Sequence, residues 1–308
     1  MAEQVRRAAE LRASEGLSER DLERELRDGR LVRVRRGVLT EQPATNLRQQ
    51  HLQLASAVGL LKDAPVFSHV TAAVAWGLPV ESRQLDRVRL IRRQGHGHGR
   101  AVRDAVEHQA SLREDEISLA SGLVVTSVPR TVIDLARTSP LEWGVIAADA
   151  ALHLRLCTRD DLLDALGDAR GRRAVSRAGR VVAFADARAE SPLESVSRLT
   201  LSRCDVPEPV LQHPITLRGR LVATSDFAWL GERVVGECDG AAKYGELLPQ
   251  GKSAQEVVMA EKRREDLIRE AGWLVVRWDW RTAWDQRRLA ERLRSALEFQ
   301  SFGRAASA

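Results

Sequence analysis

The sequence is poor in cysteine and in long apolar runs. Its three cysteines, Cys157, Cys204 and Cys238, are odd in number and far apart, so they offer neither a disulfide framework nor zinc-ligand spacing. Such usage is typical of a reducing compartment. No stretch approaches the ~18 uninterrupted apolar residues of a membrane span. The first residues, MAEQVRRAAELRASEG, are charged and unlike a signal peptide. We therefore expect a soluble cytoplasmic protein without a membrane partner.

Lysine is scarce as well. It occurs only at positions 62, 243, 252 and 262, so arginine supplies nearly all of the 48 basic residues. The formal net charge of +5 favours an acidic partner such as nucleic acid. Arginine richness also follows genome base composition, so charge alone does not identify the partner. With 308 residues, 44% of them hydrophobic, the chain suffices for two domains or one large one.

The stretch from Leu221 to Tyr244, LVATSDFAWLGERVVGECDGAAKY, predicts two short strands joined by a tight turn. Three carboxylates lie in it: Asp226, Glu237 and Asp239. Because side chains alternate along a strand, Glu237 and Asp239 share one face of the second strand.

The position of Asp226 depends on the register of the two strands. A four-residue loop, Leu230 to Arg233, pairs Asp226 with Glu237 and brings all three carboxylates to one face. A three-residue loop pairs Asp226 with Gly236 and turns it to the other face. The sequence leaves both registers open. It also leaves open a plainer interpretation, in which Asp239 begins a turn and Glu237 pairs with a nearby arginine.

Carboxylates that converge among apolar strand residues repel each other and lose solvation. A hard divalent cation with oxygen ligands relieves both costs, so we expect Mg²⁺, or Mn²⁺ in its place, as a cofactor. Lys243 follows Asp239 by four residues, near enough to add a positive charge.

This combination resembles the core of the PD-(D/E)xK nucleases, in which an Asp and an acidic strand residue hold the metal and a Lys assists the water. The longer pattern, DFAW…VVGECDGAAKY…EKRREDLIREAGWLVVRWDW, is similar to a family of unknown function allied to the very-short-patch-repair endonucleases. The resemblance covers about Glu190 to Trp284. It implies a catalytic set of Asp226, Glu237, Asp239 and Lys243, the three acids also binding the metal. In the classical pattern the Lys stands two residues after the acid, where this chain has Asp239, so Lys243 must reach in or catalysis is lost.

The same resemblance concerns two helices. A helix before the sheet often supplies an acidic residue to the metal, and Glu194, in the ESVSR segment, matches it. Glu194 and Arg198 are equally spaced for an i,i+4 ion pair. The resemblance also places Lys262 or Arg263 near the site or the phosphates, although a run of mixed charge is usually a solvated helix face.

The N-terminal residues predict a helix over Ala2 to Ser14, a second helix capped by Ser18, and a basic strand in RLVRVRRGVL. This order is typical of a winged helix and is similar to the N-terminal domain of AbiEi-type antitoxins, where such a segment begins the wing. We expect a nucleic-acid-binding set of Arg33, Arg35, Arg36, Lys262 and Arg263. The alternative for the strand is a solvated edge that discourages strand pairing.

Three further segments are interpreted as structural. The segment TSVPRTVIDLAR also resembles the AbiEi-like family, and its Arg130 and Asp134 are spaced to pair at i,i+4. His69, near the start of an apolar stretch, is interpreted as a core or capping histidine. His96 and His98 stand in a glycine-rich loop that predicts a hairpin tip rather than a metal site.

Together these patterns predict an α/β (α+β) protein of three parts: a winged-helix-like domain over 1–85, an AbiEi-like α/β and helical connector over 86–185, and a restriction-endonuclease-like mixed sheet flanked by helices over 186–300. We expect a metal-dependent endonuclease acting on double-stranded DNA. The alternative is an antitoxin-type transcriptional regulator whose nuclease-like domain is inactive. A homodimer or a toxin partner is compatible with either.

Overall fold

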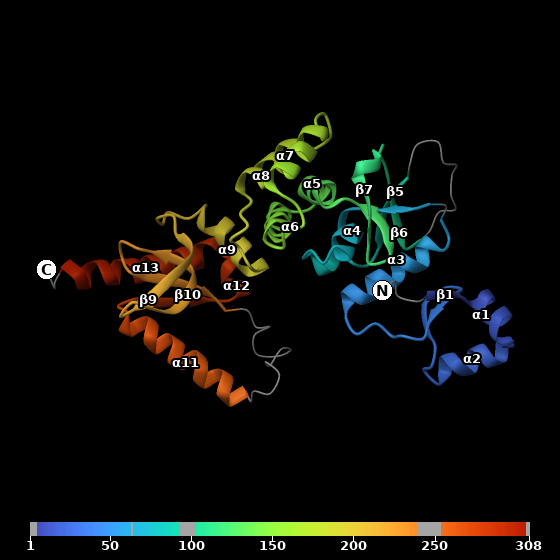
Figure 1. Ribbon diagram of the computed structural model, residues 1–308, viewed down its shortest axis with the longest axis horizontal. Coiled ribbons are helices and arrows are strands. Elements are labelled where there is room, and N and C mark those ends of the chain that lie inside the picture. The colour runs from blue at the N-terminus through green and yellow to red at the C-terminus, as the bar shows by residue number, and fades with distance from the viewer. Residues whose placement is uncertain (1–4, 63, 93–102, 240–253, 306–308) are drawn as a thin grey trace. The chain divides into compact units, whose positions relative to one another are not determined.

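The computed structural model describes residues 5–62, 64–92, 103–239 and 254–305 (Figure 1). Helices and three sheets, antiparallel and mixed, make it an α+β protein, as the sequence predicts. The chain divides into two compact units, Met1–Ala185 and Asp186–Ala308. Among the described helices, none is both long and apolar enough to cross a membrane.

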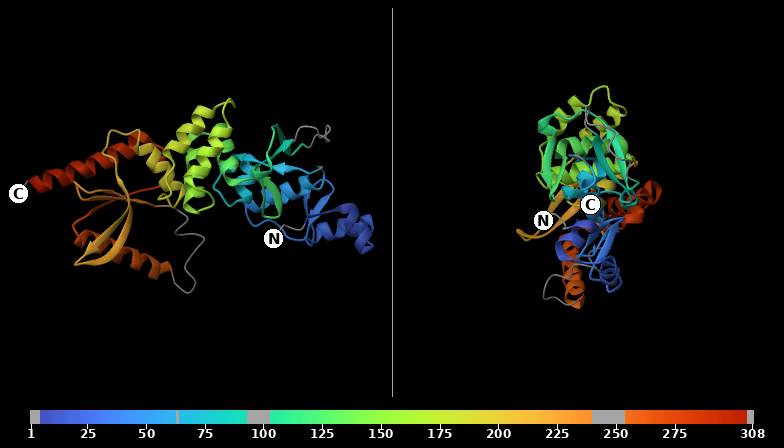
Figure 2. Two further views of the ribbon diagram at one scale, coloured as in Figure 1. Left: turned by 45° about the horizontal axis from the view of Figure 1, so that its top comes forward. Right: turned by 90° about the vertical axis from the view of Figure 1, so that its right-hand side faces the viewer.

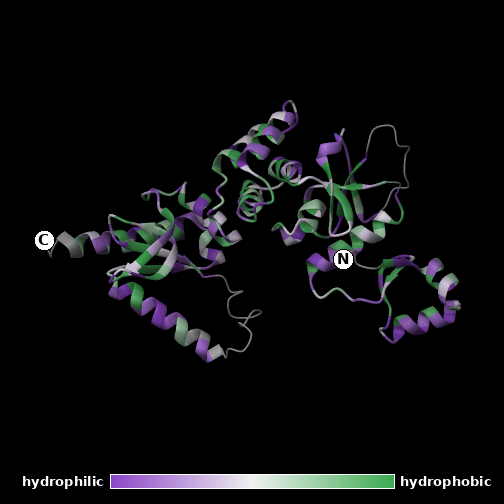
Figure 3. Cartoon of the chain, viewed as in Figure 1, coloured by the Kyte–Doolittle hydropathy of each residue, from purple (hydrophilic) through white to green (hydrophobic). Residues whose placement is uncertain are grey.

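A small antiparallel sheet and two helices open the first unit. Strands β1 (Val5–Arg7), β3 (Val38–Thr40) and β2 (Val32–Arg35) lie in the order β1-β3-β2. Helices α1 (Ala8–Glu15) and α2 (Glu19–Arg27) bury leucines with this sheet: Leu11, Leu22, Leu31 and Leu39. Ser18 caps α2 by accepting a hydrogen bond from the Asp21 N–H. Apart from its leucines α2 is charged, so it is hydrophilic over most of its length (Figure 3).

The first helix begins later than the sequence predicts. It starts at Ala8 rather than Ala2, because Val5–Arg7 pair with β3 and place Val5 opposite Thr40. Strand pairing with an available edge outweighs the helix propensity of these residues.

A five-stranded mixed sheet follows, in the order β6-β5-β4-β8-β7. Its strands are β4 (Val66–Phe67), β5 (Val88–Arg92), β6 (Ala105–Gln109), β7 (Ile117–Ala120) and β8 (Leu123–Thr126). Helices α3 (Leu47–Gly59) and α4 (His69–Ala75) share an apolar cluster with it. The short 3₁₀ helices η1 (Ser82–Gln84) and η2 (Glu114–Glu116) lie in the connections. The expected domain boundary between residues 85 and 86 falls inside this sheet, because Val66 of β4 pairs with Ile91 of β5.

Four helices complete the first unit. They are α5 (Val128–Thr138), α6 (Leu141–His153), α7 (Arg159–Asp168) and α8 (Val175–Phe184). In α5 the buried Arg130 Nε donates to Asp134 Oδ2 at 2.8 Å, which is the pair that the i,i+4 spacing predicts. Arg130 Nη1 also donates to Glu116 Oε1 at 2.6 Å, so this guanidinium ties α5 to the residues before β7.

The second unit is a four-stranded mixed sheet between helices. In chain order its elements are α9 (Pro192–Leu201), β9 (Val210–Leu217), β10 (Arg220–Trp229), β11 (Val234–Cys238), α11 (Ala254–Glu270), β12 (Leu274–Trp278), α12 (Trp280–Ala283) and α13 (Gln286–Ala305). The strand order is β12-β11-β10-β9. Strands β9, β10 and β11 form an antiparallel meander, and β12 runs parallel to β11.

Helices cover both faces of this sheet, with α11 and α13 on opposite sides (Figures 1 and 2). On one face, Ile268 of α11 joins an apolar cluster with Ala228 and Val235. On the other face, Trp278 Nε1 donates to Ser197 Oγ of α9 at 2.8 Å. Gly236 permits this packing, since a Cβ there would lie 2.4 Å from the Trp278 ring.

Candidate active site

The register of β10 and β11 decides where Asp226 lies. Phe227 pairs with Gly236, Ala228 with Val235 and Trp229 with Val234, which leaves Leu230 to Arg233 as a four-residue loop. One step further along the ladder, Asp226 stands opposite Glu237. Of the two registers that the sequence leaves open, the structure has the one that brings the two acids to one face, the face toward α11.

Asp226 and Asp239 lie where β11 ends. Asp226 is half-buried, and its Oδ2 accepts a hydrogen bond from the Cys238 N–H at 2.7 Å. Asp239 is also half-buried, and its backbone N–H donates to the Trp278 carbonyl at the end of β12, at 2.8 Å. The acids therefore gather at the carboxyl ends of the two parallel strands, an edge where open α/β sheets bind ligands.

Glu237 is buried, with 7% of its surface exposed, and two arginines hold its carboxylate. Arg264 Nη2 of α11 lies 2.7 Å from Oε1, and Arg277 Nη2 of β12 lies 3.0 Å from Oε2. The Arg264 contact is an ion pair whose angles are not those of a hydrogen bond, so Oε1 has no hydrogen-bond donor in the described part of the chain. The plainer interpretation of Glu237, a pair with a nearby arginine, thus describes its contacts.

The arginines are shared with further acids of α11. Glu261 contacts both of them, with Arg264 Nη1 at 3.2 Å, and Glu265 Oε2 lies 3.4 Å from Arg277 Nη2. Burial opposes the charge on both arginines, but these carboxylates outweigh it and raise the pKa of each guanidinium. Arg269 also pairs with Glu265, so the three glutamates and Asp226 carry four negative charges against three positive ones. The cluster therefore keeps an excess of negative charge that attracts a cation.

Glu194 makes contacts that neither interpretation of the sequence anticipates. Its Oε1 accepts from Ser191 Oγ at 2.7 Å, and its Oε2 accepts from the Glu190 N–H at 3.0 Å and from Gln212 Nε2 at 2.9 Å. In return, the Glu194 N–H donates to Ser191 Oγ, which caps the start of α9, and the Gln212 bond joins Glu194 to β9. Arg198, the expected i,i+4 partner, has Asp186 Oδ2 at 3.8 Å instead. Both oxygens of Glu194 thus accept hydrogen bonds at the start of α9, and its expected place among the metal ligands stays a prediction.

The basic residues expected to bind nucleic acid differ in their exposure to solvent. Arg33 and Arg36 of the N-terminal sheet are exposed, as are Lys262 and Arg263 on α11. Arg35 is a correction: its side chain is 13% exposed and lies 3.5 Å from Asp104 Oδ2, because a bulge between Arg33 and Arg35 shifts the register of β2. Lys243 lies outside the described residues, and so do His96 and His98.

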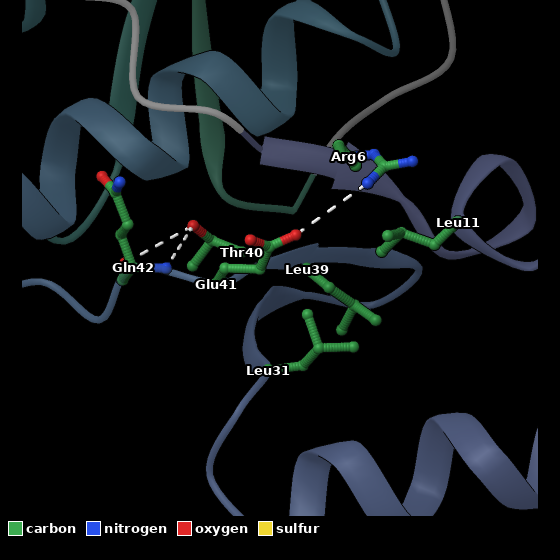
Figure 4. Close-up of a pocket in the computed structure, with 7 residues that line it drawn as sticks. All are labelled: Arg6, Leu11, Leu31, Leu39, Thr40, Glu41 and Gln42. Atoms are coloured by element: carbon green, nitrogen blue, oxygen red, sulfur yellow. Dashed lines mark hydrogen bonds and ion pairs between the residues drawn. The ribbon is translucent and has the colours of Figure 1, made fainter. Parts of the chain in front are cut away.

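Two pockets of the structure lie away from these acids. The one in Figure 4 has a volume of about 20 Å³ and lies among residues of β1, α1 and β3, with Arg6 Nη1 3.9 Å from Glu41 Oε1. Such a space holds about one water molecule. A wider hollow of about 510 Å³ runs along α13 beside Pro207 and Glu232. Within the described residues no three His, Cys, Asp or Glu side chains are placed to hold a metal together.

Comparison with known proteins gives relatives without a stated activity. No family model matches the chain. Two uncharacterized proteins of Mycobacterium tuberculosis are similar to it, MT2308 of strain CDC 1551 / Oshkosh and Rv2248 of strain ATCC 25618 / H37Rv. Each is 33% identical over 156 residues, which is 51% of this chain and 55% of the relative. The chain thus spans about half the length of the curated relatives it matches.

The contacts of Arg264 and Arg277 with Glu237 were not predicted from the sequence. The signal for Arg264 is its helical phase: Ile268 is buried against the sheet, and Arg264 precedes it by four residues on the same face of α11. Lys262 and Arg263 are out of that phase and point to solvent. The signal for Arg277 is weaker, since it depends on the parallel pairing of Arg277 with Glu237 in β12 and β11.

Proposed function

We propose that this protein binds DNA and hydrolyses phosphodiester bonds at the site formed by Asp226, Glu237 and Asp239. The observation that carries the proposal is the register of β10 and β11, which sets Asp226 opposite Glu237 at the end of a mixed sheet. A purely structural sheet has no need to gather acids at one end of its core strands. The resemblance to the PD-(D/E)xK nucleases implies the same use of these positions.

The donor set fits a divalent cation of the Mg²⁺ kind. Mg²⁺ is usually bound through one or two carboxylates and keeps several waters, so three protein ligands are not required. Asp226 and Glu237 supply such a pair, and Asp239 follows at the end of β11. Arg264 and Arg277 already hold the Glu237 carboxylate, so a cation bound beside it shares that carboxylate with the two guanidiniums. Bound there, Mg²⁺ or Mn²⁺ supplies Lewis-acid polarisation of the phosphoryl oxygen and an activated water.

The chain's own groups have separate tasks in this proposal. Arg264 and Arg277 hold the Glu237 carboxylate in place across the sheet. Exposed Lys262 and Arg263 attract the phosphate backbone to α11. Lys243 orients the attacking water or neutralises developing charge, as the family resemblance implies.

The first unit supplies duplex binding. Its small sheet with two helices presents Arg33 and Arg36 to solvent, and these two guanidiniums contact DNA phosphates. The three cysteines of the chain are free, which suits a cytoplasmic protein.

One observation favours a second candidate function. Glu237 already has two arginine partners, and Asp239 stands where the nuclease pattern has its lysine. A domain that has lost catalysis keeps its fold with such internal pairs. The second candidate is therefore an antitoxin-type transcriptional regulator, which binds DNA through the first unit and a toxin or a second copy of itself through the second.

Plasmid nicking in Mg²⁺ and in Mn²⁺ tests the proposal. We expect nicking by the wild type and its loss in Asp226→Ala and in Glu237→Ala, because each removes a carboxylate from the site. Glu194→Gln is the control: glutamine keeps an oxygen that can accept the Ser191 hydrogen bond at the start of α9, so we expect this variant to nick like the wild type.

One outcome contradicts the nuclease, and another contradicts the role given to Glu194. If the wild type does not nick but binds duplex DNA tightly, the regulator is the better account. If Glu194→Gln loses nicking with an unchanged melting temperature, Glu194 is a ligand and the capping assignment fails.

A further inference from the structure

Arg264 of α11 brings a positive charge to the acids of the candidate active site. Its Nη2 lies 2.7 Å from Glu237 Oε1 and donates to the Thr224 carbonyl at 3.1 Å, while its Nη1 donates to Glu261 Oε1 at 3.2 Å. Burial opposes this charge, yet Glu237, Glu261 and Asp226 raise the pKa of the guanidinium. A permanent positive charge therefore lies within electrostatic reach of both carboxylates that are proposed to hold a cation.

This charge works against a bound metal ion. Two like charges about 4 Å apart near a protein surface repel strongly enough to change an affinity more than tenfold. The Arg264 guanidinium also stands directly at Glu237 Oε1, so it takes one side of the oxygen that a metal ion needs. A metal ion and Arg264 thus compete for the same carboxylate.

Of the two arginines on Glu237, Arg264 is the easier one to displace. Arg277 Nη2 is surrounded by carboxylates, because it contacts Glu261 and Glu265 as well as Glu237. Arg264 contacts two carboxylates, and 32% of its side chain is exposed. An ion pair that is open to solvent is screened, so its loss costs little. Arg264 can therefore leave Glu237 while Arg277 keeps the carboxylate in place.

Nucleic acid brings a competing anion to the same side of α11. Lys262 and Arg263 are exposed and are proposed to attract the phosphate backbone, and Arg264 follows them directly in the helix. A guanidinium binds a phosphate through two parallel hydrogen bonds, which is a stronger contact than a screened ion pair. A phosphate that reaches α11 is therefore able to draw Arg264 away from Glu237.

We infer that Arg264 is an exchangeable counterion: it neutralises Glu237 in the free protein and moves to a nucleic-acid phosphate when the substrate binds. The site then binds its divalent cation more tightly with the substrate than without it. This inference rests on the proposed function of the site. It adds Arg264 to the residues that contact phosphate, and it couples the binding of metal to the binding of nucleic acid.

Manganese binding without nucleic acid is the first test. The electron paramagnetic resonance signal of free Mn²⁺ reports the affinity, and no cleavage is involved. We expect Arg264→Gln to bind Mn²⁺ roughly tenfold more tightly than the wild type, because a like charge beside the ion is removed. Arg269→Gln is the matched control. It removes an exposed cation of the same helix that pairs with Glu265, and it should change the affinity by less than about twofold.

Duplex binding in EDTA tests the exchange without metal. The probe is a fluorescein-labelled DNA duplex, and anisotropy gives its affinity. We expect Glu237→Gln to tighten binding by roughly fivefold, because it releases Arg264 to the phosphates. In the Arg264→Gln background the same change should alter the affinity by less than about twofold, since no guanidinium is left to release. Arg264→Met, which keeps the apolar stem without the charge, repeats both measurements if Arg264→Gln is poorly folded.

Three results would overturn the inference. One is an equal Mn²⁺ affinity in the wild type and in the variants without the Arg264 charge. Another is an equal gain in duplex affinity from Glu237→Gln with and without Arg264. The last is a wild type that does not bind the duplex.

Plasmid nicking decides the nuclease proposal separately. Nicking by the wild type together with equal gains in duplex affinity keeps the nuclease and removes the exchange at Arg264. The expected pattern of duplex affinities without any nicking removes the nuclease and keeps the exchange, now as a property of a DNA-binding regulator.

Discussion

At the scale of single residues, Glu237 is a buried carboxylate of the second unit, with 7% of its surface exposed. A buried carboxylate loses its water, and the loss is offset only where cations and donors replace that water. Arg264 and Arg277 provide this replacement from two different elements, α11 and β12. Both guanidiniums keep partial contact with solvent, which screens their attraction to Glu237 and limits what each pair contributes.

The Arg277→Ala variant should be less stable than the wild type by about 1–3 kcal/mol, less than a fully buried pair would lose. The change leaves Glu237 with one cation and removes the positive charge between Glu237, Glu261 and Glu265. Urea unfolding followed by tryptophan fluorescence measures the loss. Arg269→Ala is the control, since Arg269 pairs with Glu265 at the exposed surface and should change stability by less than about 0.5 kcal/mol. Equal losses in both variants would contradict a special role for Arg277.

The acids could be predicted from the sequence, because alternation along a strand places Glu237 and Asp239 without knowledge of the partner strand. The arginines that pair with Glu237 could not be predicted from the sequence. The sequence predicts that the strand with Arg277 pairs with the strand of Glu237, but the register that sets Arg277 opposite Glu237 has no local signal. The contacts of Glu194 with Ser191 and Gln212 were not predictable either, because the ESVSR segment suggests only an i,i+4 pair with Arg198 or a metal ligand.

At the scale of elements, the start of α4 is unusual. His69 has a left-handed φ of 51°, which a residue other than glycine rarely adopts. Its ring stacks on His108 of β6, with centroids 4.1 Å apart, and its Nδ1 lies 2.9 Å from Ser68 Oγ. The interpretation of His69 as a core histidine agrees with its 5% exposure. The packing of α4 against β6 thus depends on an imidazole that stays neutral.

Stability should fall as the pH is lowered through this histidine pair. Burial lowers the pKa of His69 to about 3, and burial also lowers that of His108. Below pH 6.5, the ordinary pKa of histidine, His69 therefore binds a proton in the unfolded chain and not in the folded chain. Above pH 6.5 the stability is fully present, and below it the unfolding free energy should decrease by about 1.4 kcal/mol per pH unit for His69.

Urea midpoints measured between about pH 7 and pH 5 test this linkage. The His69→Asn variant cannot titrate, and asparagine tolerates a left-handed backbone, so its curve should be shallower than that of the wild type. Parallel curves for the two proteins would refute the assignment to His69.

Elements with a strong local signal were predictable, and those made by distant pairing were not. The capping box that begins at Ser18 predicts α2, and the alternation of apolar and polar side chains in β10 and β11 predicts the hairpin. The strand β1 has no such signal, since Val5–Arg7 become a strand only when β3 offers its edge. The sheet that joins β4 to β5 likewise crosses the boundary that the residue pattern suggested.

At the scale of the whole molecule, the protein is cationic and its charge is carried by arginine. A cationic protein that binds DNA through phosphates releases counterions, so its affinity falls with salt. Both units contribute exposed cations, Arg33 and Arg36 from the first and Lys262 and Arg263 from the second.

Duplex binding by the Arg33→Ala, Arg36→Ala double variant should be weaker and less dependent on salt. Loss of two phosphate contacts lowers the slope of log affinity against log salt by about 2. Filter binding or anisotropy over a range of salt concentrations measures the slope. The Arg35→Ala control removes a partly buried ion pair with Asp104, so it should lower stability and leave the slope unchanged. A slope that changes in Arg35→Ala and not in the double variant would show that the basic strand presents its other side to DNA.

The arginines that pair with Glu237 have a consequence for how the newly synthesised protein folds. A metal site made of carboxylates without cationic partners folds only when the ion binds, because repulsion between the carboxylates opposes the native state. Here Arg264 and Arg277 neutralise the buried acid from within the chain. A newly synthesised molecule therefore does not need a divalent ion to neutralise Glu237 before this part of the sheet can fold.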